Sequence, residues 1–369
     1  MQDNNVDNDI YEKLSSGIMG FATADALGVP IEFTMRQSHA INPLTEMVGY
    51  GSHNVPEGTW SDDTSMTIAT MDSITEKKGI DYDDMMDKFC SWCGEAKYTA
   101  TDQLFDIGIG TRKALMSYHN RVTSALNSGG REEKNNGNGS LMRMFPVVFY
   151  LHYANLSDNE VTKIINDCSS LTHGHEISKL GCRIYFDLMD GILDGKSIKD
   201  AYEELKNKDY SKWYSEETIS KYSRILDGSI ENAQESSIKS SGFVVDTLEA
   251  AIWCSLNTSS YEESAIKAVN LGDDTDTVGA ITGSITGVSY GKVTIPERWI
   301  SKLRKKDYLD ELCKNYAEFL AEINLIHSPR INDEESFNYD DELFKMLTGG
   351  STGSDEEEIK PINVFWSEE

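Results

Sequence analysis

The segment VNLGDDTDTVGAI, residues 269–281, places three aspartates within four positions and between apolar residues. Carboxylates this close repel one another and resist burial unless a cation or hydrogen-bond donors compensate their charge. Divalent cations such as Mg²⁺ take oxygen ligands, and Asp274 and Asp276 are spaced to flank one ion. Thr277 adds a hydroxyl oxygen. The segment therefore predicts a divalent-cation site, with a helix N-cap or a flexible acidic loop as the simpler alternatives.

A second acidic cluster, GTWSDDTSM at residues 58–66, opens an apolar run with helical spacing. It holds Asp62 and Asp63, with the hydroxyls of Ser61 and Thr64 on either side. Taken alone, such a cluster is typical of a helix N-cap. Two clusters about 210 residues apart in sequence would instead supply four carboxylates and two hydroxyls to one shared centre. This donor set predicts a binuclear magnesium or manganese site, and the absence of imidazole and thiolate donors argues against zinc.

A third feature is the glycine-rich stretch NNGNGSLMRMFPV, residues 135–147. Gly137 and Gly139 would let the backbone approach a ligand closely, and N–H groups ahead of a helix can cradle phosphate. Asn138 and Ser140 add side-chain donors, and a nearby arginine, Arg143, would help to hold the loop. A glycine-rich stretch is otherwise often only a turn, so the residues alone leave both interpretations open.

Helices are the elements that must position these groups. Apolar residues recur at three- and four-residue spacing over most of the chain, which predicts helices. The stripes cover residues 10–22, 66–73, 85–92, 159–171, 175–193, 243–256, 260–270, 275–290 and 307–326. Because hairpin signals are absent, the sequence predicts an all-α fold of about a dozen helices. Both acidic clusters would then lie at helix N-termini, where backbone N–H groups favour negative charge.

The chain has 369 residues and a formal net charge of -28. A surface this acidic repels nucleic acid and anionic membranes, so we expect neither as a partner. The sequence shows no signal peptide and no apolar run of membrane-spanning length, so we expect a cytoplasmic protein without a transmembrane helix. Six cysteines are expected to be reduced and mostly buried. Cys90 and Cys93 form a CSWC inside a helical pattern, which favours core packing over redox chemistry.

The composition changes near residue 330. From residue 332 to residue 369, twelve acids stand against two lysines, and GGSTGS occupies residues 349–354. This composition is typical of a mobile acidic tail. We therefore expect one all-helical domain over residues 1–330 and a flexible acidic tail over residues 331–369.

The chain also carries five motifs in a fixed order: GIMGFATADALGVPIEF (17–33), GTWSDDTSM (58–66), NNGNGSLMRMFPV (135–147), LTHGH (171–175) and LGDDTDTVGAITG (271–283). Together they resemble the ADP-ribosylglycohydrolases, which include the ADP-ribosylarginine hydrolases and the dinitrogenase reductase-activating glycohydrolase. Any one motif is weak, whereas five in order over about residues 10 to 295 are specific. The resemblance implies an all-α orthogonal multi-helix bundle with two Mg²⁺ ions, for which Mn²⁺ is a candidate substitute.

The resemblance also implies a set of metal ligands. The matching positions are Ser61, Asp62, Asp63, Asp274, Asp276 and Thr277. Members of the family often have Thr at position 61, where Ser61 keeps the hydroxyl. They often have Gly at position 273, where Asp273 adds a carboxylate and makes the assignment of ligands less direct. A glycine common at position 24 is Ala24 here, which we interpret as a packing difference.

Further residues receive roles from the resemblance. Glu32 matches an acid that closes over the substrate, although its surroundings alone suggest an exposed glutamate after a proline turn. His173 resembles a residue near the diphosphate or the distal ribose, and a structural histidine at a helix start is the alternative. Asp25 would support the metal centre or its own helix without binding metal. The expected substrate-binding residues are Gly137, Asn138, Gly139, Ser140 and His173.

The implied reaction is hydrolysis of the bond between C1″ of ADP-ribose and a protein side chain, with arginine favoured. Asp62, Asp63 or Glu32 would take the proton of a metal-oriented water, and nearby carboxylates would favour an oxocarbenium-like transition state. The expected partner is an ADP-ribosylated protein, with an ADP-ribosyltransferase as a further candidate. The alternative is a non-catalytic protein that binds ADP-ribose, or an immunity protein that neutralises a transferase by contact. The complete set of ligand oxygens argues for the enzyme.

Overall fold

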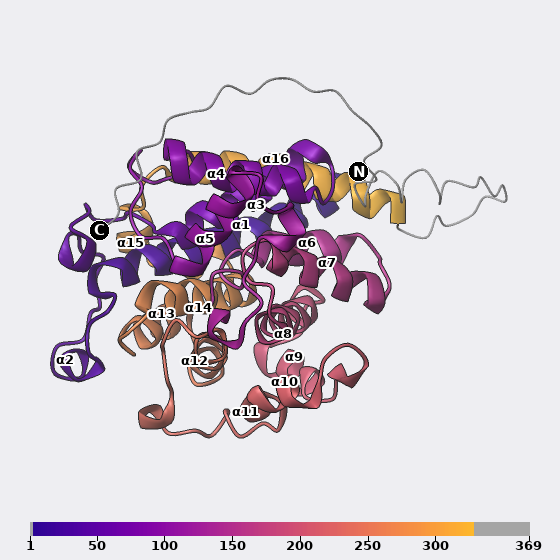
Figure 1. Cartoon of the computed structure of the whole chain (residues 1–369). Helices are drawn as coiled ribbons and strands as arrows, with labels where there is room; N and C mark the ends of the chain where they lie inside the picture. The colour runs from indigo at the N-terminus through magenta and orange to yellow at the C-terminus, as the bar shows by residue number, and fades with distance from the viewer. Residues whose placement is uncertain (1–2, 328–369) are drawn as a thin grey trace, which may run out of the picture.

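Two helices rich in small residues, α1 (Asp3–Gly28) and α14 (Thr275–Tyr290), form the centre of the fold (Figure 1). The computed structural model describes residues 3–327, and within them the regular elements are α-helices and short 3-10 helices, with isolated bridges but no strand. The predicted all-α fold is therefore confirmed for this part of the chain. The acidic tail predicted for residues 331–369 lies outside the described residues.

The helices agree closely with the apolar stripes in the sequence. The other α-helices are α2 (Arg36–Ile41), α3 (Asp62–Lys77), α4 (Tyr82–Glu95), α5 (Ile109–His119), α6 (Phe145–Tyr153), α7 (Asp158–Ser170), α8 (Glu176–Leu193), α9 (Ile198–Leu205), α10 (Glu216–Lys221), α11 (Ser223–Leu226), α12 (Val244–Leu256), α13 (Tyr261–Val269), α15 (Glu297–Ile300) and α16 (Lys306–His327). The 3-10 helices are η1 (Val29–Ile31), η2 (Gly51–His53), η3 (Ala125–Asn127), η4 (Glu133–Asn135), η5 (Tyr210–Lys212), η6 (Glu235–Ser237) and η7 (Lys292–Thr294).

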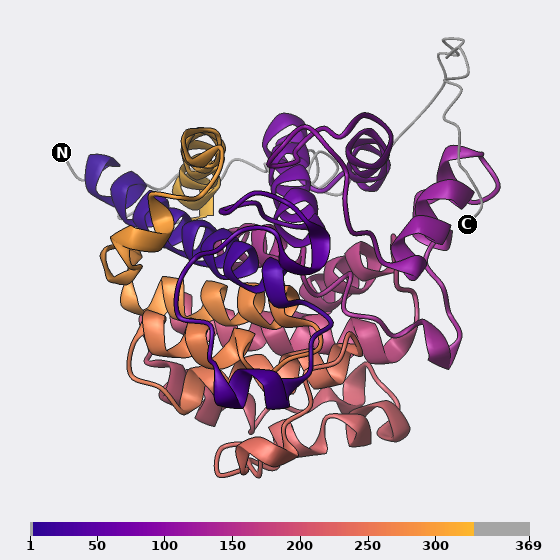
Figure 2. The same ribbon diagram turned by 90° about the vertical axis from the view of Figure 1, so that its left-hand side faces the viewer.

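Other helices cover the central pair on two sides. Helices α3 and α16 pack against α1, and α4 and α6 pack against α3 in turn. Helices α12 and α13 pack against α14 on the opposite side (Figures 1 and 2). This arrangement buries both central helices, and it leaves the start of α14 beside the start of α3.

Glycines set the distance between α1 and α14. A Cβ added at Gly283 would lie 2.4 Å from the carbonyl oxygen of Gly20, and one added at Gly287 would lie 2.5 Å from that of Ser16. At the end of α1, a Cβ on Gly28 would lie 2.5 Å from the carbonyl oxygen of Thr275. The two backbones are thus in direct contact, because no side chain separates them. The contact fixes where the first turn of α14 lies relative to the end of α1.

Gly283→Ala should destabilise the protein by about 1–3 kcal/mol, because the new methyl group would clash with the Gly20 carbonyl group and with the short Ala24 side chain, neither of which can swing aside. Gly94→Ala is the matched control, since a Cβ there meets nothing within 4 Å in the last turn of α4. That substitution should be neutral or stabilise by up to about 1 kcal/mol. Thermal denaturation followed by circular dichroism measures both changes. Equal midpoints for the two variants would contradict the direct backbone contact.

The long first helix contains the most apolar stretch that could be mistaken for a membrane span among the described residues. By length and composition, the segment Asn8–Ile31 could cross a membrane, because an 18-residue window within it has a mean hydropathy of 1.2. In the structure, 94% of that window is buried. Its apolar side chains contact α14 and α16, which is the environment of a core helix.

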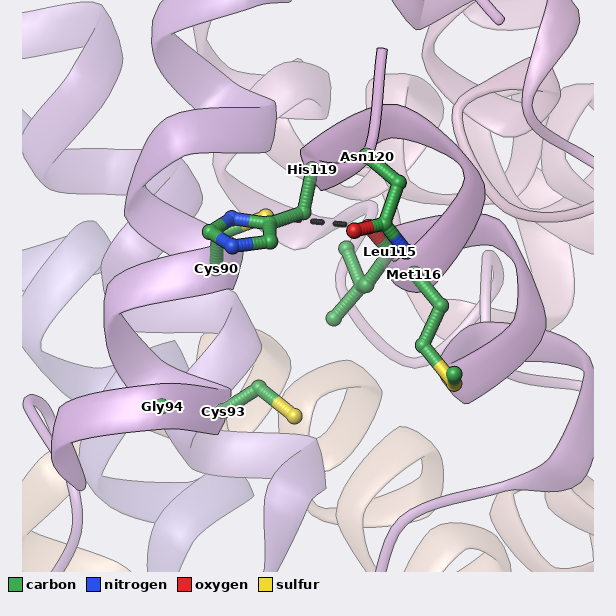
Figure 3. A pocket seen from close by; sticks show the side chains of 7 residues that line it. All are labelled: Cys90, Cys93, Gly94, Leu115, Met116, His119 and Asn120. Carbon is green, nitrogen blue, oxygen red and sulfur yellow. Dashed lines mark hydrogen bonds between the residues drawn. The ribbon is translucent and has the colours of Figure 1, made fainter. Parts of the chain in front are cut away.

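The CSWC pair lies on α4, as the helical pattern predicted. Figure 3 shows Cys90 and Cys93 beside a small hollow of about 40 Å³, closed on the other side by Leu115, Met116 and His119 of α5. The Cys90 thiol is 4.0 Å from the carbonyl oxygen of Leu115. Burial raises the pKa of Cys90 to about 12 and also raises that of Cys93. Both thiols therefore stay protonated, and the pair fills the α4–α5 contact.

Candidate metal and active centre

The N-termini of α3 and α14 meet inside the molecule. The hydroxyl of Thr277 donates to Oδ1 of Asp63 at 3.2 Å, although the two residues are 214 positions apart. The contact between Gly28 and Thr275 brings the end of α1 to the same place, so η1 carries Glu32 there. The two acidic clusters of the sequence therefore form one centre.

Helix capping explains the presence of only some residues in the two acidic clusters. The hydroxyl of Ser61 caps α3 by accepting from the backbone N–H of Asp63 at 3.3 Å. Asp274 occupies the N-cap position of α14, but its side chain makes no capping hydrogen bond. Asp62 and Asp63 stand in the first turn of α3 and Asp276 in that of α14, where the helix dipoles favour negative charge. The aspartates are thus available for another role.

The carboxylates form two overlapping groups. Ligand oxygens of Asp25, Asp63 and Asp276 lie within 4.8 Å of one another, and so do those of Glu32, Asp274 and Asp276. Asp276 belongs to both groups, so the centre has the layout of two neighbouring oxygen-rich sites. The donors suit a hard cation such as Mg²⁺ or Mn²⁺.

A buried polar atom without a partner gives an independent test of that fit. Among the described residues, Oδ2 of Asp63 is buried and accepts no hydrogen bond. An ionised oxygen in this position is costly unless a cation is close. The residues present therefore fit a divalent cation.

Burial and neighbouring negative charges raise the pKa values of the aspartates in this centre. Burial is the largest cause that raises the pKa of Asp62, Asp63 and Asp276 well above the usual range, and neighbouring carboxylates raise each of them further. Burial also raises the pKa of Asp25 to about 6, and its hydrogen bonds partly offset that rise. Like charges this close cannot all ionise without a compensating cation.

Asp25 holds the start of α3 in place. Its carboxylate accepts from the backbone N–H groups of Ser61 and Thr64 at 2.9 and 3.1 Å and from the Thr64 hydroxyl at 2.6 Å. These bonds use three donors at the N-terminus of the helix. Asp25 therefore orients the residues beside it, which agrees with the supporting role expected from the sequence.

Glu32 is buried rather than exposed, so the simple interpretation of its sequence context was wrong. Its Oε2 forms a short contact with Nε2 of His53 from η2. Burial raises the pKa of Glu32 to about 7, the His53 contact opposes the rise, and the charges of Asp106 and Asp274 add to it. Glu32 can therefore exchange a proton near neutral pH.

His53 and Asp106 are the two members of this centre that sequence reasoning missed. Glu32, His53 and Asp106 place ligand atoms within 4.8 Å of one another. Asp106 lies in the loop before α5, where its φ is 50°. Burial raises the pKa of Asp106, while the charge of His53 and a hydrogen bond with Asp62 lower it. The signal available in the sequence was a single acid inside the apolar stretch LFDIGI, residues 104–109.

The glycine-rich loop is tied to the carboxylates through Asn138. The amide of Asn138 donates to Oδ2 of Asp274 at 2.9 Å and to the hydroxyl of Thr247 at 3.0 Å. Its backbone N–H donates to the carbonyl oxygen of Gly242 at 3.0 Å. The loop thus lies beside the carboxylate centre, and Asn138 orients one of its acids.

His173 lies under the same loop. A Cβ on Gly139 would lie 2.8 Å from Cε1 of His173, and one on Gly137 would lie 3.3 Å from Nε2. The Nδ1 atom is 2.9 Å from the Thr172 hydroxyl. Burial lowers the pKa of His173 to about 3, so the ring is neutral. The structure therefore joins the GNG and LTHGH motifs in one unit, with glycines where a side chain would strike the ring.

Ser140 differs from the other predicted substrate residues. Its hydroxyl is fully buried, accepts from Ser169 at 3.0 Å and lies 3.6 Å from the Cys182 sulfur. Contact of this side chain with a substrate stays a prediction, and the geometry leaves the main chain of Ser140 as the better candidate. Arg143 is also buried and donates to the carbonyl oxygen of Cys168 and the hydroxyl of Thr172 at 2.9 Å each, which holds the loop as expected.

Comparisons with known proteins fit this geometry. Residues 7–325 match the family model described as ADP-ribosylglycohydrolase. The chain is 29% identical to the ADP-ribosylarginine hydrolase Tri1 of Serratia proteamaculans, over 84% of this chain and 80% of that protein. It is 26% identical to the ADP-ribosyl-[dinitrogen reductase] glycohydrolase of Rhodospirillum rubrum, over 80% and 92% of the two chains. A solved structure described as an ADP-ribosylglycohydrolase-related protein complex aligns with a TM-score of 0.70 and 27% identity, covering 85% of this chain and 99% of that one.

Proposed function

Because the chain belongs to the ADP-ribosylglycohydrolase family, we propose that it removes mono-ADP-ribose from modified arginine side chains of proteins with the help of two Mg²⁺ ions. The observation that carries the proposal is the meeting of both acidic clusters at the N-termini of α3 and α14. The arginine linkage is supported by the relative from Serratia proteamaculans, which is named an ADP-ribosylarginine hydrolase.

Six residues would hold the two ions, as the resemblance implied. They are Ser61, Asp62, Asp63, Asp274, Asp276 and Thr277. When bound, Mg²⁺ or Mn²⁺ would supply Lewis-acid chemistry, which lowers the pKa of water and orients hydroxyl groups. The orphaned oxygen of Asp63 and the two overlapping carboxylate groups support Asp63, Asp274 and Asp276 in this assignment.

The protein groups around the cation sites have separable tasks. Asp25 and Asn138 position the acids through the hydrogen bonds described above. Glu32, with a pKa of about 7 and a contact to His53, is suited to accept the proton of an attacking water at a carboxylate oxygen. Asp62 and Asp63 are the other candidate bases. The surrounding carboxylates would stabilise positive charge on the ribose as its bond to the target weakens.

The decisive assay follows free ADP-ribose by mass spectrometry after the protein is mixed with an arginine-ADP-ribosylated protein. We expect release with Mg²⁺, none with EDTA, and none from the variant Asp274→Ala/Asp276→Ala. The matched control, Asp307→Ala/Glu311→Ala, removes two exposed acids of α16 and should retain wild-type activity. Release of ADP-ribose by the wild-type protein in EDTA, or by the Asp274→Ala/Asp276→Ala variant in Mg²⁺, would contradict the metal-dependent mechanism.

A calorimetric titration with ADP-ribose separates the remaining outcomes. Binding without release would indicate another linkage or a non-catalytic protein that binds ADP-ribose. No binding in the presence of Mg²⁺ would contradict the site itself. The non-catalytic alternative is not favoured, because every expected ligand oxygen is present and the relatives compared above are named as hydrolases.

A further inference from the structure

Arg143, which follows the glycine-rich loop, is a buried cation without an acidic partner. Its side chain is fully buried, and its hydrogen bonds within residues 3–327 go only to a carbonyl oxygen and a hydroxyl. Its Nε and Nη1 atoms have no partner there, and the guanidinium lies 4.9 Å from the centre of the Phe89 ring. Burial lowers the pKa of Arg143 to about 10, so the group stays charged near neutral pH. A buried charge is costly without a counterion, which indicates a task other than ion pairing.

The hydroxyl of Thr172 connects Arg143 to the ring of His173. Its oxygen lies 2.9 Å from Nη2 of Arg143 and 2.9 Å from Nδ1 of His173. Arginine can only donate, so the hydroxyl accepts from Arg143. Its own proton then has one acceptor among the described residues, which is Nδ1 of His173. Because a neutral imidazole carries one proton, that proton is on Nε2.

The Nε2 atom of His173 lies between three glycines. A Cβ added at Gly110 would lie 3.2 Å from Nε2 and one added at Gly137 would lie 3.3 Å from it, while one added at Gly139 would lie 2.8 Å from Cε1. Nε2 has no partner within residues 3–327, and it is not among the fully buried atoms that lack one, so solvent reaches it. The N–H of Gly139 also donates to no acceptor in that part of the chain. Two free donors therefore lie side by side at an opening that only glycines leave.

The charges around this opening select the kind of acceptor that it binds. Burial lowers the pKa of His173 to about 3 and the charge of Arg143 lowers it further, so the ring donates as a neutral group. The guanidinium behind Thr172 favours a negatively charged oxygen in front of the ring. The loop also borders the carboxylate centre through the bond from Asn138 to Asp274. Within ADP-ribose, the diphosphate is the anionic part and the ribose hydroxyls are neutral.

We propose that Arg143 and Thr172 are positioning residues, which hold His173 as the Nε2–H tautomer so that it donates to a diphosphate oxygen of ADP-ribose between the glycines. The inference rests on the proposed function, which makes ADP-ribose the ligand, and deepens it by assigning two buried residues to its recognition. The opposite tautomer would leave the Thr172 proton without an acceptor among the described residues. It would also turn the lone pair of Nε2 toward the phosphate oxygen, which repels it.

Calorimetric titration with ADP-ribose and with ADP, both in Mg²⁺, tests the role of the hydroxyl. Thr172→Val removes it and keeps the shape of the side chain, so the affinity for both ligands should fall about threefold to tenfold, the effect of one hydrogen bond. Thr172→Ser keeps the hydroxyl and should bind both ligands like the wild type. The matched control is Thr162→Val, because Thr162 is also buried and its hydroxyl accepts from another buried arginine, Arg183. That variant should bind both ligands with unchanged affinity.

Nuclear magnetic resonance of the protein with isotopically labelled histidine identifies the tautomer directly. The wild-type protein without ligand should show His173 protonated at Nε2, and Thr172→Val should show a larger share of the Nδ1–H form. His173→Gln keeps a donor near the position of Nε2, whereas the amide of His173→Asn ends near that of Nδ1. The Gln variant should therefore bind ADP-ribose more tightly than the Asn variant.

Several results would overturn the proposal. They are an Nδ1–H ring in the wild-type protein, unchanged affinity in Thr172→Val, and a loss in Thr172→Ser as large as that in Thr172→Val. A loss for ADP-ribose without one for ADP would move the acceptor to the distal ribose and overturn its assignment to the diphosphate. Failure of the proposed function is a separate result, because a protein that binds ADP-ribose without releasing it from arginine still shows the tautomer and the affinity ratios. No binding of either ligand by the wild-type protein would overturn both proposals.

Discussion

Metal-free Asp63→Asn protein should unfold about 2–4 °C above the metal-free wild type, while its Mg²⁺-dependent activity falls at least about 1000-fold. Both effects come from the same atom. Oδ2 of Asp63 is buried without a hydrogen-bond partner among the described residues, and Asp25 and Asp276 lie within 4.8 Å. Without a cation, an amide relieves the repulsion and can donate to these neighbours. With a cation, the amide removes a ligand charge.

Asp25→Asn is the matched comparison, because it makes the same chemical change at a neighbouring buried acid. Both oxygens of Asp25 accept from groups at the start of α3. An amide nitrogen would face these donors, so the metal-free protein should lose about 2–4 kcal/mol of stability. Thermal scans in EDTA measure both variants, and activity assays with Mg²⁺ follow. A loss of stability in Asp63→Asn as large as that in Asp25→Asn would show that Asp63 is structural.

The second large effect is a reversal of the pH dependence of stability when metal is added. Glu32 has a pKa of about 7 and Asp25 one of about 6, both raised mainly by burial, so the metal-free folded chain binds more protons than the unfolded chain. Its stability should therefore fall as the pH rises from about 4 to about 7. Cations bind the deprotonated acids, so Mg²⁺ affinity should rise over the same range. For each proton that is released when Mg²⁺ binds, the Mg²⁺ affinity should increase about tenfold per pH unit.

Thermal midpoints in EDTA and in Mg²⁺ at pH 5.5, 6.5 and 7.5 measure this reversal, and calorimetry in two buffers counts the protons released. The difference between the EDTA and Mg²⁺ midpoints should widen steadily as the pH increases. Glu32→Gln should narrow the pH-dependent part of that difference, because one titrating group is removed. A difference that is constant with pH would contradict the raised pKa values.

Local patterns predicted the fold and much of the centre well. The helices matched the apolar stripes because one face of each helix is buried, which repeats every three to four residues. The structure adds that the glycines of α14 allow its tight packing against α1. The two aspartate clusters could be assigned to one shared centre from the sequence, because each stands at the start of a predicted helix and neither has enough basic residues nearby to compensate its charge. The supporting role expected for Asp25 agrees with its hydrogen bonds to the start of α3, and the expectation that it does not bind metal stays a prediction.

Residues whose role depends on loop geometry were harder to predict. His53 reaches the centre from the short 3-10 helix η2 and Asp106 from a loop, and neither segment is long enough or regular enough for a periodicity that shows which way a side chain points. The sequence suggested an exposed Glu32 because the proline turn before it does not predict that η2 covers this residue. The hydroxyl of Ser140 turned inward because Ser169 and Cys182, which are distant in sequence, offered it partners.

The direct backbone contact between Gly20 and Gly283 also has a consequence for biosynthesis. Helix α1 leaves the ribosome early, but the partner that buries it is translated near the end of the folded region. At about 5–20 residues per second, α1 waits roughly 10–50 s for α14. During that interval its apolar side chains need a chaperone or temporary contacts with α3 and α6. The nascent chain therefore acquires its cation sites late, when nearly all of the domain has been made.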